Sequence, residues 1–332
     1  MKESPARRPA IQRLVDCRLM TMNIPRTAAA QLPPVAANCA ELEQAISAAR
    51  RAGKSIGFVP TMGALHEGHL SLVDAARRQC DYIVASVFVN PTQFGPGEDF
   101  QKYPRTLDTD LGALATRGVD LVFNPATSDL YSPEHATRVE VAGPALPLEG
   151  QFRPGHFSGV ATVVLKLFNL VAPDWAYFGQ KDFQQALVVR RMVTDLDLPV
   201  RVAVCPIVRD HDGLALSSRN VYLSAGEREQ ALFINRGLRA ARELFAGGER
   251  RLAVIAQRLR EVLAGAPALR PDYAVVVDAD TLAAVERAQR PVVALVAARV
   301  GATRLIDNHL LAEPFPELPA GRPATSPPGP PL

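Results

Sequence analysis

The stretch Ile56–Leu70, which reads I-G-F-V-P-T-M-G-A-L-H-E-G-H-L, predicts a strand, a glycine-containing turn and the start of a helix. Its first four residues, Ile56–Val59, form a short apolar run that is typical of a buried parallel strand. Beyond the turn, apolar residues recur at helical spacing. Because open α/β sheets bind ligands where a strand ends and a helix begins, His66 and His69 lie at the expected ligand edge.

The two histidines are spaced to act on one group. Residues three apart in a helical turn are neighbours, and each imidazole can offer an N–H to a phosphate beside the amide donors of the helix N-terminus. An H-E-x-x-H zinc site has its two histidines four residues apart on a helix, with the Glu as the base. Here the histidines are three residues apart, and Glu67 lies beside Gly68 in a turn. A structural role is typical of a lone histidine, but not of two beside glycines. We therefore interpret His66 and His69 as phosphate-binding residues.

The turn also carries a recognisable motif. Its H-E-G-H resembles the H-x-G-H signature of the nucleotidyltransferase superfamily, which includes the class I tRNA synthetases. The longer P-T-M-G-A-L-H-E-G-H at Pro60–His69 resembles the pantothenate synthetase (pantoate–β-alanine ligase) family. The resemblance extends over roughly residues 40–310 and is densest at four separated segments, all at the expected edge of one sheet.

Composition excludes several classes of protein. The 332 residues are 48% hydrophobic and 21% charged, which is typical of a globular protein long enough for two domains. A net charge of +3 with scattered Lys and Arg indicates no nucleic-acid partner. No apolar run approaches the ~18 residues of a membrane span. The cysteines show no C-x-x-C spacing, so we expect reduced thiols in a cytoplasmic protein: Cys17, Cys39, Cys80 and Cys205.

The order of predicted elements indicates an α/β fold, with a doubly wound, Rossmann-like parallel sheet domain followed by a smaller α+β domain. We assign residues 37–206 to the first domain and residues 207–310 to the second. The resemblance implies that the first binds ATP and pantoate and that the second closes over the active site. The arm at 1–36 and the Pro-rich tail at 311–332 are expected to be disordered. Within the second domain we expect a helix over Ala279–Glu286 between two apolar strands.

A further helix is predicted from Leu107 to Arg117, with Thr106 as its cap. Its first turn carries Asp108 and Asp110. Acidic residues there are more often favourable charges at the positive end of a helix than magnesium ligands, so we assign neither to a metal site.

Polar side chains also follow the next predicted strand, Asp81–Val89, on the same side of the sheet as the histidine turn. A turn built on Asn-Pro explains Asn90 and Pro91, but it does not explain Gln93. The resemblance places pantoate at this loop and implies that Gln93 binds it, since an amide can both donate and accept hydrogen bonds. In the later segment E-G-Q-F-R-P-G-H-F-S-G at 149–159, a structural loop explains Arg153, His156 and Ser158 as well as an active-site role does.

A second strand–turn–helix is predicted after Asp174–Phe178, where G-Q-K-D-F-Q-Q occupies 179–185. A lone Lys is usually a solvated surface residue, but Lys181 lies at the ligand edge of the sheet and is a compact cation suited to phosphate oxygens. The resemblance implies that Gly179–Asp182 contact ATP and that Gln185 contacts pantoate.

The polar loop at 208–220 contains L-S-S-R. Two hydroxyls and a guanidinium in succession suit a triphosphate, because Ser donates hydrogen bonds and Arg forks onto oxygens. A Ser-rich linker between domains explains the same residues, and both readings hold if the cleft lies at the domain junction. By resemblance, this loop plays the part of the mobile K-M-S-K-S loop of the synthetases.

The residues that the resemblance carries over fall into three sets. Those expected to act in catalysis are His69, His66, Lys181 and Arg219. Those expected to bind ATP are Met62, Gly63, Ala64, Leu65, His66, Glu67, Gly68, His69, Gly179, Gln180, Lys181, Asp182, Val208, Leu216, Ser217, Ser218 and Arg219. Those expected to bind pantoate are Gln93 and Gln185.

The resemblance implies a ligase of pantothenate biosynthesis that works in two steps. The carboxylate of (R)-pantoate attacks the α-phosphorus of ATP, giving pantoyl adenylate and pyrophosphate, and the amine of β-alanine then displaces AMP. We expect Mg²⁺ to ride on the phosphates without a protein metal site, and His69 to be the better candidate for proton donation to the developing charge. We expect no covalent acyl-enzyme, because no Ser-His-Asp or Cys-His arrangement is visible. A homodimer is also implied.

Two other functions remain open at this point. Another adenylyltransferase of the superfamily would act on a mononucleotide or on phosphopantetheine; a tRNA synthetase fits less well, since no anticodon-binding extension is present. A non-catalytic ATP-binding module is the alternative from a different class. The presence of His66, Lys181 and Arg219 together favours catalysis over that alternative.

Overall fold

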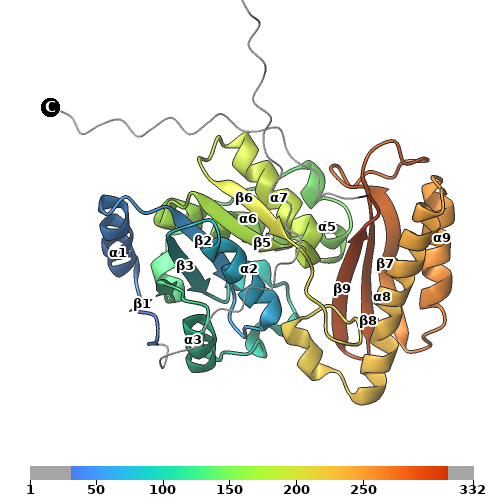
Figure 1. Ribbon diagram of the computed structural model, residues 1–332, viewed down its shortest axis with the longest axis horizontal. Helices are drawn as coiled ribbons and strands as arrows, with labels where there is room; N and C mark the ends of the chain where they lie inside the picture. Colours follow the sequence, from blue (N-terminus) through green and yellow to red (C-terminus); the bar gives the residue numbers. More distant parts are fainter. Residues whose placement is uncertain (1–30, 313–332) are drawn as a thin grey trace, which may run out of the picture. The chain divides into compact units, whose positions relative to one another are not determined.

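The computed structural model describes residues 31–312. Its first sheet has six strands, all paired in parallel, and Figure 1 shows helices packed around it. The strands are β1 (Val35–Ala36), β2 (Ile56–Thr61), β3 (Tyr82–Val87), β4 (Leu121–Phe123), β5 (Trp175–Gly179) and β6 (Arg201–Cys205). Their order is β1-β4-β3-β2-β5-β6, and every pairing is parallel. The strand order reverses direction between β2 and β5, which is the switch point of a doubly wound sheet. The predicted fold class is therefore confirmed.

Helices cover both faces of this sheet. They are α1 (Cys39–Arg51), α2 (Glu67–Arg77), α3 (Leu107–Ala115), α4 (Thr127–Leu130), α5 (Glu149–Phe152), α6 (His156–Val171) and α7 (Phe183–Asp195). Neighbouring residues of β2 point to opposite faces, so Phe58 packs with α1 and α6 while Val59 packs with α2 and α3. The continuous apolar strands predicted from the sequence follow from this burial on both faces.

Single-turn 3₁₀ helices occupy several connections at the edges of the sheet. They are η1 (Pro91–Gln93), η2 (Asp99–Gln101), η3 (Gly143–Ala145), η4 (Gln180–Asp182) and η5 (Ser218–Tyr222). Three of them contain or adjoin the polar residues singled out above.

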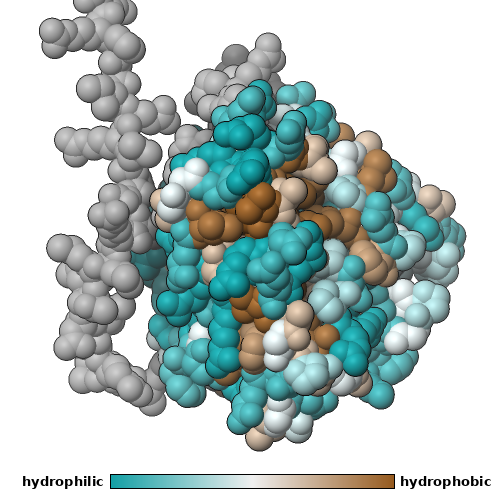
Figure 2. All heavy atoms as spheres, turned by 90° about the vertical axis from the view of Figure 1, so that its right-hand side faces the viewer, coloured by the Kyte–Doolittle hydropathy of each residue, from teal (hydrophilic) through white to brown (hydrophobic). Residues whose placement is uncertain are grey.

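A second sheet is antiparallel and smaller. It consists of β7 (Leu269–Asp278), β8 (Val292–Val300) and β9 (Thr303–Leu310), in that order, and α8 (Ala225–Ala246) and α9 (Leu252–Leu263) cover one of its faces. On the side of the molecule turned to the viewer in Figure 2, hydrophilic residues predominate and apolar ones appear between them. This agrees with helices whose apolar faces are buried on the sheet and whose charged faces meet solvent.

The opposite face of the second sheet packs on helices α5 and α7, which belong to the part of the chain that forms the first sheet. Val293 and Leu295 of β8 share a buried cluster with Phe183 and Leu187, which lie in the first two turns of α7. Arg304 of β9 also bonds through both of its terminal nitrogens to Glu149 of α5, at 2.7 Å each. The two sheets are therefore joined by an apolar cluster and by a buried ion pair.

The structure differs from the sequence-based expectations at three places: the end of the N-terminal arm, the start of the C-terminal tail and one expected helix. Val35–Ala36 pairs with β4, so the sheet takes in the end of the expected arm, and Leu311 is buried with its amide bonded to Val292. The expected helix at Ala279–Glu286 is a turn and an extended connection. Asp278 accepts from two backbone N–H groups of that segment, and Leu282 has φ of 59°, which does not continue a helix. Residues 1–30 and 313–332 lie outside the described part.

None of the helices in residues 31–312 combines the length and apolar character needed to cross a membrane.

The ion pair between Glu149 and Arg304 generates a stability prediction. Burial by itself would raise the pKa of Glu149, but the hydrogen bonds and the charge of Arg304 outweigh it and hold the pKa below its ordinary value of 4.5. Replacing Glu149 with Gln should lower the free energy of unfolding by about 3 kcal/mol at neutral pH, because the partly buried Arg304 then keeps only Asp272 as a charged partner. Urea unfolding measures this loss.

The pH dependence of that loss has a defined sign. A carboxylate whose pKa is lowered by folding stabilises the protein above its unfolded pKa and loses this effect as pH falls through the folded value. The difference between the protein and the Glu149→Gln variant should therefore shrink below pH 4.5. Glu261→Gln, at an exposed ion pair with Arg258, is the control and should cost less than about 1 kcal/mol. Equal losses in the two variants would contradict the prediction.

Candidate active site

The main candidate site is a cleft along the carboxyl ends of the parallel strands. Residues just beyond β2, β3, β5 and β6 line it together with α6 and the loop before η5. Of the residues predicted to act here, those that line the cleft are Met62, His66, Gly68, His69, Gln93, Gly179, Lys181, Asp182, Gln185, Val208, Leu216, Ser217, Ser218 and Arg219. Four segments that are far apart in the sequence thus meet at one edge of the sheet.

The turn after β2 fixes the orientation of both imidazoles. Nδ1 of His66 accepts the backbone N–H of Gly68 at 3.1 Å, and Nδ1 of His69 accepts the backbone N–H of His66 at 3.4 Å. Because each Nδ1 is an acceptor, a neutral ring carries its hydrogen on Nε2. The two ring centroids are 4.1 Å apart. The turn therefore presents two neighbouring Nε2–H donors.

Both imidazoles are uncharged at neutral pH. Burial, together with the positive charge of Lys181, lowers the pKa of His66 to about 4. Burial lowers the pKa of His69 to about 3, with smaller contributions from His66 and Lys181. A neutral imidazole donates a hydrogen bond through its single N–H, at Nε2. It lacks the second ring proton that an imidazolium ion could transfer as an acid. The lowered pKa favours a hydrogen-bond donor at His69, and the proton donation expected from the sequence stays a prediction.

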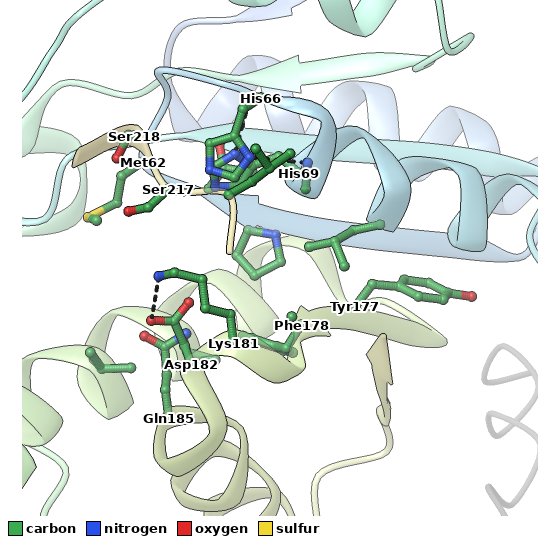
Figure 3. Close-up of a pocket in the computed structure, with 18 of the residues that line it drawn as sticks. Met62, His66, His69, Tyr177, Phe178, Lys181, Asp182, Gln185, Ser217 and Ser218 are labelled. Carbon is green, nitrogen blue, oxygen red and sulfur yellow. Dashed lines mark hydrogen bonds and ion pairs between the residues drawn. The ribbon is translucent and has the colours of Figure 1, made fainter. Parts of the chain in front are cut away.

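Lys181 faces the histidines from the opposite side of the cleft (Figure 3). Its Nζ lies 4.0 Å from the carboxylate of Asp182, on the same short helix η4. The backbone of η4 is held by Asn308 of β9, which is fully buried and donates to the carbonyl oxygens of Gln180 and Lys181 at 2.9 and 3.0 Å. The second sheet therefore positions the one lysine of the cleft.

Two other predicted nucleotide-binding residues point elsewhere. The side-chain amide of Gln180 donates to Asn308 at 3.1 Å, and the carboxylate of Glu67 pairs with Arg117 at 2.7 Å on the surface. Neither side chain lines the cleft, and the contact of these two residues with ATP stays a prediction.

Arg219 attaches the loop that contains Ser217 and Ser218 to η2, the short helix that follows β3. Its guanidinium bonds to both oxygens of Asp99 through Nε and Nη2 at 2.8 Å each, and the hydroxyl of Ser218 lies 3.3 Å from that of Tyr103. Nη1 of Arg219 makes no hydrogen bond within residues 31–312. The ion pair therefore fixes the loop, and only part of the guanidinium is left to meet an anion.

The two glutamines expected to bind pantoate line the same cleft. Gln93 is buried, with its carbonyl oxygen 3.2 Å from the amide of Asn90 and its amide 3.1 Å from the sulfur of Met62. Gln185 has a side-chain amide with no hydrogen bond among the described residues. Its neighbour Gln184 instead donates to two backbone carbonyls and accepts from Glu149. Of the adjacent residues Gln184 and Gln185, only Gln185 has a side chain available to a ligand.

Arg153 and His156 support the Gln93 loop from outside the cleft. Arg153 pairs with Glu98 at 2.7 Å and bonds to Nε2 of His156 at 3.0 Å, while Nδ1 of His156 lies 2.8 Å from the carbonyl oxygen of Gln93. The structure thus gives these residues a positioning role. Ser158 bonds to Glu140 on the surface, away from the cleft.

Sequence reasoning did not identify the apolar wall of the cleft. Its residues lie on α6, at positions three and four apart, and are Val160, Val163, Val164 and Leu167. Their spacing is typical of any buried helix face, so no local signal separates a cleft wall from the core. Asn90 was explained as a turn residue, yet it is buried, lines the cleft and bonds to Gln93 and to the carbonyl of Gly159.

Comparison with known proteins identifies one family. The family model for pantoate-beta-alanine ligase matches residues 34–310. The chain is 58% identical over 260 residues to the pantothenate synthetase of Acidobacterium capsulatum, across 78% of this chain and 87% of the relative. It is 53% identical over 266 residues to the pantothenate synthetase of Moorella thermoacetica, across 80% of this chain and 94% of the relative.

Solved structures agree with this result. The pantothenate synthetase of Thermus thermophilus is 48% identical and superposes with a TM-score of 0.81, across 84% of this chain and 100% of that chain. The pantoate-beta-alanine ligase of Francisella tularensis, solved in complex with beta-gamma ATP and β-alanine, is 34% identical, with a TM-score of 0.69 across 84% of this chain and 98% of that chain.

The state of the imidazoles can be tested directly. Nitrogen-15 NMR of histidine-labelled protein should show His66 and His69 as neutral Nε2–H tautomers from about pH 5.5 to pH 8, because burial disfavours their charged forms. Lys181→Met should raise the pKa of both rings, since it removes a positive charge that lowers them. An Nδ1–H tautomer, or titration of either ring near its ordinary pKa in the unmodified protein, would refute this description.

Proposed function

This chain belongs to the pantoate-beta-alanine ligase family and condenses pantoate with β-alanine using ATP, and we propose that it does so through a pantoyl adenylate formed in the cleft described above. One observation carries the proposal. Two Nε2–H donors from the turn after β2 and the ammonium group of Lys181 after β5 converge on one cleft, which the hydroxyls of Ser217 and Ser218 also line.

The first step needs alignment and charge stabilisation more than proton transfer. An oxygen of the pantoate carboxylate forms a bond to the α-phosphorus, and the bond from that phosphorus to the bridging oxygen breaks, so pyrophosphate leaves. His66 and His69 donate hydrogen bonds to phosphate oxygens as negative charge develops on them, and Lys181 supplies the positive charge. Neutral donors held in place by the turn stabilise this charge without a proton having to move.

The pantoate end of the cleft is proposed from its chemistry. Pantoate carries two methyl groups beside a hydroxyl and a carboxylate, so it needs an apolar surface next to hydrogen-bonding groups. The wall formed by α6 supplies the first, and the amides of Gln93 and Gln185 supply the second. We therefore assign pantoate to the space between these two glutamines and α6.

The second step uses the amine of β-alanine as the nucleophile. It attacks the acyl carbon of the adenylate, a C–N bond forms, the C–O bond to phosphate breaks, AMP leaves, and the nitrogen releases one proton to solvent. The Francisella relative, solved with both an ATP analogue and β-alanine, supports the use of these two ligands by one enzyme. Closure of the cleft would shield the mixed anhydride from water between the steps.

Further parts of the proposal concern the metal, the assembly and the location. Mg²⁺ would neutralise charge on the phosphates, with Asp182 as the carboxylate that lines the cleft; within residues 31–312 no group of three acidic, His or Cys side chains could hold a metal by itself. We also propose a homodimer and a cytoplasmic location; reduced thiols at Cys39 and Cys80 support the location. The division into residues 37–206 and 207–310, with the second part closing over the cleft, remains a proposal.

The activity is tested by omitting each substrate in turn. Pantothenate and AMP should form only with pantoate, β-alanine and ATP together, and exchange of pyrophosphate into ATP should need pantoate alone. His69→Ala should lower this exchange by about 100-fold, from loss of one donor to the developing charge. His211→Ala, at a side chain that is 89% exposed, is the matched control and should leave exchange unchanged.

Each alternative function predicts a different outcome of that assay. Pyrophosphate release with a phosphate ester in place of pantoate would identify another adenylyltransferase. ATP binding with no AMP release under any condition would identify a non-catalytic module. Unchanged exchange in His69→Ala would exclude the role of that imidazole.

The pantoate site makes a separate prediction. Gln93→Ala and Gln185→Ala should each raise the KM for pantoate by about 10-fold or more, with the affinity for ATP retained, because each removes a hydrogen-bonding group from the acid and not from the nucleotide. Gln151→Ala, on the exposed part of α5, is the control. An equal loss of ATP affinity in either glutamine variant would show that it is wrongly placed.

A further inference from the structure

The turn that carries the histidines contains an anion site that the protein fills with its own carboxylate. Gly63 and Ala64 have φ of 83° and 50°, two successive residues in the left-handed region. Successive N–H groups in such a turn point to one side and form a concave site for a negative charge. Here the backbone N–H groups of Ala64 and Leu65 donate to Oδ2 and Oδ1 of Asp110 at 3.0 and 2.8 Å.

Asp110 differs from its neighbour on the same helix. Its side chain is 1% exposed, and the hydroxyl of Thr106 lies 3.3 Å from Oδ2, whereas Asp108 is exposed. Within residues 31–312, no Lys, Arg or His side chain bonds to this carboxylate. Burying a carboxylate without a cation costs free energy unless hydrogen bonds satisfy its oxygens. The contact therefore stabilises the carboxylate of Asp110 as well as the amides of the turn.

The expectation that Asp110 is an ordinary first-turn charge is therefore corrected. The amide groups of Ala64 and Leu65 are already satisfied by its two oxygens, so these amides do not reach a phosphate. His66 follows Leu65 directly, and its own N–H and Nδ1 connect to His69 and Gly68. The carboxylate thus fixes the backbone from which both imidazoles project.

We propose that Asp110 is a positioning residue for the adenylation step: its carboxylate holds the turn at 63–65 so that His66 and His69 present Nε2–H to the phosphates. This inference rests on the function proposed above for the two histidines. It also explains the glycine at 63, since a Cβ there would lie 3.0 Å from Oδ2 of Asp110 and 3.1 Å from Val87.

Only a carboxylate satisfies both amide groups. An Asn side chain has the same shape, but one of its two terminal atoms is an NH₂ donor, which would face an N–H donor of Ala64 or Leu65. The Asp110→Asn variant therefore breaks one hydrogen bond and places two donors against each other, with little change in volume. Asp108→Asn makes the same change of charge two residues away on the exposed side of α3.

The experiment compares these two variants by exchange kinetics and by nitrogen-15 NMR of the histidines. In Asp110→Asn, pantoate-dependent exchange should fall about 10- to 100-fold, since small misplacements of reacting groups have effects of this size, while the KM for pantoate stays the same. The signals of His66 and His69 should lose the pattern of a hydrogen-bonded Nδ1 acceptor. Asp108→Asn should match the unmodified protein in both measurements.

The outcomes separate this inference from the proposed function. Histidine signals and exchange equal to those of Asp108→Asn would overturn the inference. A fall in exchange with unchanged histidine signals and a lower melting temperature would also overturn it, because Asp110 would then be merely structural. Altered histidine signals with normal exchange would support the positioning of the imidazoles and contradict their catalytic role.

A milder variant covers the case in which Asp110→Asn does not fold. Thr106→Val removes only the hydroxyl contact to Oδ2 of Asp110. It should shift the same two histidine signals and lower exchange about 3-fold, since a single long hydrogen bond from a neutral hydroxyl is lost. Unchanged signals in this variant would overturn the inference.

Discussion

The cleft depends on a backbone turn that would not hold its shape unaided. The chain leaves β2, passes through two residues with positive φ and enters α2 within a few residues, and a non-glycine residue such as Ala64 adopts that conformation only when its surroundings require it. The carboxylate of Asp110 supplies the requirement by bonding to two amides of the turn. The positions of both imidazoles follow from this contact between segments 46 residues apart.

In the cleft, the hydrogen-bond donors and the positive charge come from different side chains. Burial keeps His66 and His69 neutral, so they act as oriented dipoles, and Lys181 brings the positive charge from the other wall. Neutral rings also avoid the repulsion that two imidazolium ions would meet with their centroids 4.1 Å apart beside an ammonium group. The arrangement suits a step in which charge shifts among phosphate oxygens and no proton has to move.

The second sheet contributes to the cleft without supplying a nucleophile or base. Asn308 holds the backbone of η4, and so the position of Lys181, while Arg209 bonds to both oxygens of Asp307 and anchors the start of the loop that leads to Ser217. The shared apolar cluster around α7 joins the same sheet to the helix that follows Lys181. Displacement of this sheet would therefore move the lysine and the serine loop together.

The amino-acid sequence alone predicted the main strands and helices of the parallel sheet, apart from its edge strand Val35–Ala36. It also placed the histidine pair, Gln93, Lys181 and the L-S-S-R loop at one edge of that sheet. It could do so because strand and helix periods are local and parallel strands end on the same side of a sheet. Only the tertiary structure decided that Asp110 is buried on the turn while Asp108 is exposed, since the two share one local pattern. It likewise decided the protonation of the imidazoles and the turn at 279–286, because burial and the bonds of Asp278 depend on packing that no local pattern encodes.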